Sequence, residues 1–236
     1  MSAGQVLTAA ATAAQHTTSF TATMVIRSSG TYSSSMTGTL NEQTKPTLLA
    51  QQKFAVTSNG APLPGGMETI LTSQAVYLKI GSLQQMLGKP WVKVSFSSLK
   101  SGSGASFAPL IHQMQASDPL TSAQMLPAAT NVRKLGTATI NGVATTEYSG
   151  SLDPVKALTR VDPSLKKMVG PMMQSLGITT DTFRVWLDSQ HQIRKFSQVQ
   201  SGPRYHVTSV MTVTSVNQPV SIQVPPASQT AVSPGI

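Results

Sequence analysis

The stretch TFRVWLDSQHQIRKFSQVQ, Thr182–Gln200, decides how the rest of the chain is interpreted. Its first half alternates, and one face of an extended chain would carry Phe183, Val185 and Leu187. A period of two indicates a half-buried strand. The polar run from Asp188 suits a short loop, and β-forming residues resume at Ile193. We therefore predict a β-hairpin with one apolar face and one solvated face.

Composition limits the classes of protein to which the chain can belong. It has 236 residues, of which 39% are hydrophobic and 11% are charged. This length suits one large domain or two small ones, and serine, threonine and glutamine take the usual place of charged residues. The chain contains no cysteine, which excludes disulfides, thiolate metal sites and a cysteine nucleophile. No apolar run reaches the length of a membrane-spanning helix.

The formal net charge of +9 would allow an anionic partner. The basic residues are scattered, however, and the tightest groups are only pairs, at Arg133-Lys134, Lys166-Lys167 and Arg194-Lys195. The chain shows no arginine-rich arm and no alternation of basic and aromatic residues. The pattern therefore predicts no nucleic-acid partner.

The remaining segments extend the same β pattern. Asn141-Gly142 between β-like runs is a strong hairpin signal. Helices are predicted over residues 2–16, 107–114, 120–126, 153–160 and 162–176, with a helical turn or two at 82–87. Strands include Phe20–Arg27 and Val220–Val224. We predict an α+β fold: a strongly curved antiparallel half-barrel of about 10–11 strands, with helices packed on its concave side.

The domain prediction is a single domain over residues 1–226, followed by a flexible tail over 227–236. The acidic residues Asp118, Asp153 and Asp162 each precede proline, which is typical of helix starts. The four histidines show no metal-binding spacing, and no nucleophile elbow occurs. We therefore predict no catalytic residues, no metal, no cofactor and no enzyme activity.

Methionine is frequent, with eleven residues against twelve aromatic ones. Several fall in predicted helical segments, where methionine serves either as a core filler or as the lining of a cavity with variable contents. A wide concave face with few aromatic residues to fill it favours the cavity.

Four segments resemble a known family. They are TSFTATMVIRSSG at residues 18–30, Lys89-Pro-Trp-Val-Lys93, the Asn-Gly hairpin over residues 135–150, and Val185-Trp-Leu-Asp188 followed by Ile193-Arg-Lys-Phe196. In order and spacing they are similar to the actinobacterial extracytoplasmic lipoproteins of the LppX/LprG type, which have the LolA/LolB-like fold. The loop Asn59–Gly66 and the richness in methionine depart from that pattern.

The resemblance implies a half-barrel around a hydrophobic cavity that binds acyl chains of lipids and carries them within the cell envelope. It implies an extracytoplasmic, monomeric domain whose native form is a membrane-anchored lipoprotein, with possible contact to the membrane surface. The export signal and the lipidated cysteine of such proteins are absent from this sequence. The residues predicted from periodicity to line the cavity are Ala22, Met24, Ile26, Leu78, Met86, Leu110, Ile111, Met114, Met125, Leu165, Met168, Val169, Met172, Leu176, Val185 and Leu187.

Two alternatives remain open at this point. The same fold with a filled core would be an interaction or sensor module that binds a protein partner by a sheet edge or its outer face. An envelope hydrolase with dispersed catalytic residues would need a base, for which His112 is the candidate. Basic residues at the mouth of the cavity would pair with a lipid headgroup in the carrier hypothesis.

Overall fold

The computed structural model describes residues 1–30, 33–97, 119–153, 177–203 and 205–232. The first half contains α1 (Ala3–His16), β1 (Ser19–Gly30), β2 (Ser34–Gln43), β3 (Leu49–Ser58), β4 (Ala61–Pro62), β5 (Met67–Thr72), β6 (Ala75–Ile80), α2 (Gly81–Leu87) and β7 (Trp91–Ser95). The second contains α5 (Pro119–Met125), η2 (Leu126–Ala128), β8 (Thr130–Ile140), β9 (Val143–Leu152), β10 (Thr180–Leu187), β11 (Ile193–Gly202), β12 (Tyr205–Val216), η3 (Ala227–Gln229) and β13 (Thr230–Val232).

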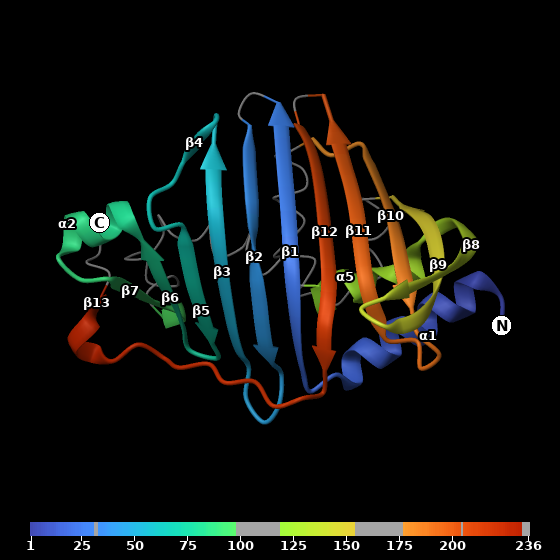
Figure 1. Ribbon diagram of the computed structural model, residues 1–236, viewed down its shortest axis with the longest axis horizontal. Helices are drawn as coiled ribbons and strands as arrows, with labels where there is room; N and C mark the ends of the chain where they lie inside the picture. The colour runs from blue at the N-terminus through green and yellow to red at the C-terminus, as the bar shows by residue number, and fades with distance from the viewer. Residues whose placement is uncertain (31–32, 98–118, 154–176, 204, 233–236) are drawn as a thin grey trace.

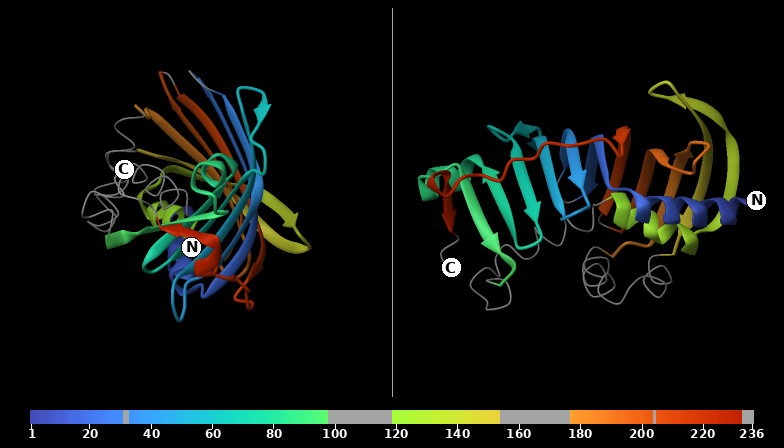
Figure 2. Two further views of the ribbon diagram at one scale, coloured as in Figure 1. Left: turned by 90° about the vertical axis from the view of Figure 1, so that its left-hand side faces the viewer. Right: turned by 90° about the horizontal axis from the view of Figure 1, so that it is seen from below.

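All thirteen strands belong to one open sheet, in the order β13-β7-β6-β5-β3-β2-β1-β12-β11-β10-β9-β8, with β4 paired to β3. Every pairing is antiparallel except that of β13 with β7. The sheet is strongly curved, and α1 and α5 lie against its concave side near β8–β12 (Figures 1 and 2). This confirms the predicted half-barrel. Two short strands, β4 and β13, account for the strand number above the predicted one.

The first helix begins where the sequence predicts, at a capping box. The amide of Gln5 donates to Ser2 Oγ at 3.3 Å, and the amide of Ser2 donates to Gln5 Oε1 at 2.7 Å. These bonds satisfy backbone donors that the first turn leaves unpaired. One face of α1 buries Val6, Leu7, Ala10, Ala11 and Ala14 against the sheet core and α5.

Both predicted hairpins are present. Asn141 and Gly142 have φ of 48° and 81° between β8 and β9, as a tight turn with two positive φ values requires. The hairpin of β10 and β11 pairs Val185 with Phe196. Its turn is held by Asp188, whose Oδ1 accepts from the amides of Gln190 and Gln192, both at 2.9 Å.

The C-terminal part of the chain differs from the prediction. Residues 220–224 form no strand but lie in a connection that runs from β12 to β13 past the ends of the strands between them (Figure 1). Pro219, Pro225 and Pro226 lack the amide that a strand ladder needs, which explains why the alternating pattern there misled. The predicted flexible tail from residue 227 is instead η3 and β13 up to residue 232, because pairing with β7 satisfies backbone groups of that edge strand.

Candidate functional site

The concave face of the β10–β11 hairpin is apolar at its centre. Phe183, Val185 and Leu187 are all buried there, as the alternation predicted. The Phe183 ring stacks on Phe196 with centroids 5.9 Å apart and an interplanar angle of 17°. The Phe183 ring also lies against Gly150 of β9, where a Cβ atom would come within 2.7 Å of the ring. The glycine thus makes room for the stacked rings of β10 and β11.

The apolar concave face continues across the centre of the sheet. In β1, Ala22 and Met24 are buried and Ile26 is half-buried against the core. Their partners in β12 are Val213, Met211 and Ser209. Because alternate residues of a strand share a face, all of these side chains lie on the concave side. Met125 of α5 packs into this cluster from the helical side.

A second apolar cluster lies at the other end of the sheet. Leu78 is fully buried in it, together with Val76, Val92 and Val94 of β6 and β7. Nearby, the hydroxyl of Thr69 in β5 is buried and has no hydrogen-bond partner among the described residues. The register pairs Thr69 with Gln52 and Leu78, which places it on the same concave side. Among the described residues, the concave face therefore carries two apolar clusters.

The predicted cavity residues fall into three groups. Ala22, Met24, Leu78, Met125, Val185 and Leu187 are buried on the concave side, and Ile26 is half-buried there. Met86 departs from the prediction because it is 62% exposed on α2, a two-turn helix at the corner of the sheet. Outside the described residues lie Leu110, Ile111, Met114, Leu165, Met168, Val169, Met172 and Leu176, as does His112.

A small cavity of about 30 Å³ lies between α1 and the ends of β1, β11 and β12. Ala14, Phe20, Ile193 and Met211 are among the residues that border it. A cavity of this volume has room for a water molecule and is too small for an acyl chain. It marks the place where packing between helix and sheet is incomplete.

The concave face also carries a polar group that sequence analysis missed. Asp181 is only 1% exposed, and burial raises the pKa of its carboxyl above the ordinary value of 3.8. Gln198 Nε2 donates to both carboxylate oxygens at 2.9 Å, and Gln200 Nε2 donates to Oδ2 at 3.0 Å. Asp181 has the same parity as Phe183 and Val185, so the alternation itself places it on the inner face.

The described residues offer little for catalysis or metal binding. Over these ranges, no three histidine, aspartate or glutamate side chains gather closely enough to hold a metal ion. The turn aspartate, Asp188, is engaged with Arg194, whose Nη2 lies 2.7 Å from Asp188 Oδ2. Within the same part of the chain, no helix has the length and apolar character needed to cross a membrane.

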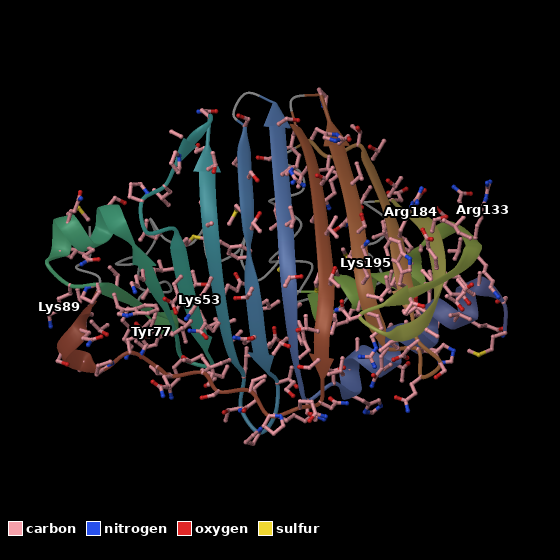
Figure 3. The ribbon with its side chains drawn as sticks, viewed as in Figure 1. Lys53, Tyr77, Lys89, Arg133, Arg184 and Lys195 are labelled. Atoms are coloured by element: carbon pink, nitrogen blue, oxygen red, sulfur yellow. The ribbon has the colours of Figure 1, made fainter. Side chains whose placement is uncertain are left out.

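The outer, convex face has a different chemistry. Its lysines lie over aromatic rings: Lys195 Nζ is 4.7 Å from the centre of the Trp186 ring, and Lys79 Nζ is 5.7 Å from that of Trp91. Lys53 Nζ lies 3.2 Å from Glu68 Oε1 (Figure 3). These contacts place charged groups on the convex face, in contrast to the apolar concave one.

Comparison with known proteins adds one sequence relative and several structures. No family model matches the sequence. A protein of Streptomyces griseus, described as an uncharacterized 31.2 kDa protein in the rplA-rplJ intergenic region, is 32% identical over 112 residues. The match covers 46% of this chain and 36% of that protein, so the chain spans only about a third of its relative's length.

Two solved structures resemble this one over nearly their whole length. The lipoprotein LppX of Mycobacterium tuberculosis matches with a TM-score of 0.53 and 17% identity, over 94% of this chain and 98% of that one. LprF of Mycobacterium bovis matches with a TM-score of 0.54 and 17% identity, over 94% and 96%. At this level of identity the likeness establishes the architecture. The chain thus has the fold of LppX and LprF, as the sequence resemblance predicted.

Proposed function

We propose that this chain is a non-enzymatic carrier of lipids or other acyl-chain ligands in the cell envelope. The observation that supports the proposal best is the division of the sheet into an apolar concave face and a polar convex face. A carrier would use the apolar concave side to enclose the apolar chains of its ligand. The shared fold with the lipoprotein LppX is consistent with this role.

Binding would be passive and without covalent steps. Apolar side chains of the concave face, such as Ile26 and Met24, would contact the ligand's methylene groups. Removing apolar surface from water contributes roughly 25 cal/mol per Å², which gives affinity without directional contacts. Hydrogen bonds to the ligand would come from groups such as the unpaired Thr69 hydroxyl, which can donate to an ester carbonyl.

The proposal includes a setting for this function, which the shared fold with LppX supports. In the proposal the domain is extracytoplasmic and monomeric, is anchored as a lipoprotein in its native form, and meets the membrane surface to exchange its ligand. No metal or cofactor takes part. The residues predicted to line the cavity but lying outside the described ranges remain part of the proposal, notably Met114, Met168 and Met172.

The test is native mass spectrometry of the purified protein, combined with lipid extraction and identification. We expect a co-purifying lipid of defined stoichiometry that a fatty acid displaces. The variant Ile26→Trp fills space on the concave side and should reduce occupancy at least several-fold, because the indole competes with the ligand for the same volume. An apo mass that stays unchanged after incubation with mixed lipids would contradict the proposal.

A matched control lies one residue away. Val25 of β1 points to the convex face, where the register pairs it with Val210 and Thr37. Val25→Trp should therefore leave lipid occupancy unchanged, although it adds the same side chain to the same strand. If Ile26→Trp only lowers the melting temperature and no lipid is found with the parent protein, the filled-core interaction module becomes the better hypothesis.

A further inference from the structure

A polar groove lies on the convex face, over the end of the sheet formed by β8–β11. It has a volume of about 330 Å³ and opens to solvent. The register aligns Ser149, Arg184 and Ser197 in one row across β9–β11, and Ser151, Thr182 and Val199 in the next. Because Val185 and Phe183 of the same strand face the concave core, these rows lie on the opposite face of the sheet.

Two guanidinium groups border the groove. Arg133 comes from the edge strand β8, opposite Ser149, and Arg184 comes from β10 (Figure 3). Arg184 Nη1 lies 3.3 Å from Glu147 Oε1, a single contact that leaves the other donors of its fork available. Arg133 makes no ion pair or hydrogen bond with any residue in the described ranges. Two arginines with uncommitted donors suit a phosphate or carboxylate.

The rest of the lining is rich in hydroxyl groups. Ser149, Ser151, Thr182 and Ser197 each offer a hydroxyl that both donates and accepts. The two rows present no aromatic ring on which a nucleobase could stack, because Phe183 turns its ring to the concave core. The chemistry therefore fits a small ligand that combines one anionic group with several hydroxyl groups.

We propose that this groove binds a phosphorylated polyol, such as a sugar phosphate or a glycerol phosphate, either free in solution or as a lipid headgroup. Arg133 and Arg184 hold the phosphate, and the serine and threonine hydroxyls contact the polyol. The groove is on the face opposite to the apolar concave side, so the site is separate from the proposed carrier cavity. Neither proposal depends on the other.

The carboxylate of Glu147 gives the proposal a distinctive test. It is 19% exposed beside Arg184, whose side chain is 63% exposed, so a bound phosphate would have to share that guanidinium with it. Glu147→Gln removes the competing negative charge, and we expect it to raise the affinity for glycerol 3-phosphate about threefold or more. Arg133→Gln and Arg184→Gln should each lower this affinity about tenfold.

The measurement is isothermal titration calorimetry with glycerol 3-phosphate, with glycerol as the uncharged probe. Lys53→Gln is the matched control, because it removes one positive charge from the same face over β3, away from the groove (Figure 3). It should leave the affinity unchanged. Absence of detectable binding, an equal loss in Lys53→Gln, or no gain in Glu147→Gln would overturn the proposal, since each result would indicate no site or diffuse surface attraction.

A vesicle assay separates the two sources of the ligand. If the groove takes a lipid headgroup, vesicles of phosphatidylglycerol should bind the parent protein more tightly than vesicles of phosphatidylcholine, and Arg184→Gln should remove the difference. If the ligand is free, glycerol 3-phosphate binds while neither vesicle does. The proposal is contradicted if both vesicle types bind equally and the soluble probe does not bind.

Discussion

Gly150 has no side chain, and this leaves room on the concave face for the ring of Phe183. The Phe183 ring occupies the space above Gly150, so a Cβ there would meet the ring at 2.7 Å. We expect Gly150→Ala to lower the free energy of unfolding by about 1–3 kcal/mol, because the ring must leave its stacked position on Phe196. The measurement is urea denaturation. Gly136→Ala in β8 is the control, since a Cβ atom at that position would meet nothing within 4 Å, and should be neutral or slightly stabilising.

At the same scale, the buried carboxyl of Asp181 predicts how the stability of the protein depends on pH. Burial raises the pKa of its carboxyl in the folded state, and the bonds from Gln200 and Gln198 only partly oppose this. The folded state then holds the proton more tightly than the unfolded one, so this group costs stability as the pH rises from about 3.8 through its folded pKa. At pH values below that window the carboxyl is protonated in both states and costs no stability. Above it the carboxyl is ionised in both states, and the full loss of stability applies.

Asp181→Asn removes this ionisation. We expect the free energy of unfolding of the parent protein, relative to the variant, to fall as the pH rises across that window and then to stay constant. Urea midpoints measured between pH 3 and pH 8 would show it. A parent protein that instead gains stability over the variant as the pH rises would mean that the two glutamine bonds outweigh desolvation.

At the scale of elements, the β8–β9 hairpin depends on the backbone of its turn. Asn141 has a positive φ of 48°, and its side-chain Nδ2 donates to Val213 O at 3.2 Å. Asn141→Ala should lower the free energy of unfolding by about 1–2 kcal/mol, because alanine resists the left-handed conformation. Asn141→Gly keeps that conformation and loses only the hydrogen bond, so thermal denaturation should show the smaller loss for glycine. Equal losses would assign the whole effect to the Val213 contact.

Sequence patterns predicted the elements where local rules decide the structure. The start of the first helix, the Asn141-Gly142 turn and the alternation around Val185 all depend on neighbouring residues, and all are confirmed. The residues of the concave face followed from the same alternation. The pairing of β13 with β7 was not predictable, because it joins residues far apart in the sequence. The groove beside Arg184 likewise depends on the register of four strands.

At the scale of the whole molecule, the two apolar clusters of the described residues lie in different parts of the sheet. Val92 and Val94 belong to a small cluster at the β7 end, whereas α1 and α5 pack at the other end. Ending the chain after Gln218 removes β13 and should raise the rate of amide hydrogen exchange in β6 and β7, because β7 loses its outer partner. Exchange in β10–β12 should change little. A uniform increase over all strands would show one cooperative unit instead.

The connection between β12 and β13 ties together two strands that lie far apart in the curved sheet. It is fastened at one end by Asn217, which accepts from the Thr18 amide at 2.9 Å, and at the other by the parallel pairing of β13 with β7. Its dozen or so residues can extend to roughly 40 Å at most. Because the connection runs past the ends of the strands between them, its length limits how far apart β12 and β13 can lie (Figure 1). Shortening or lengthening this segment should therefore change the curvature of the sheet, and with it the width of a ligand that the concave side can enclose.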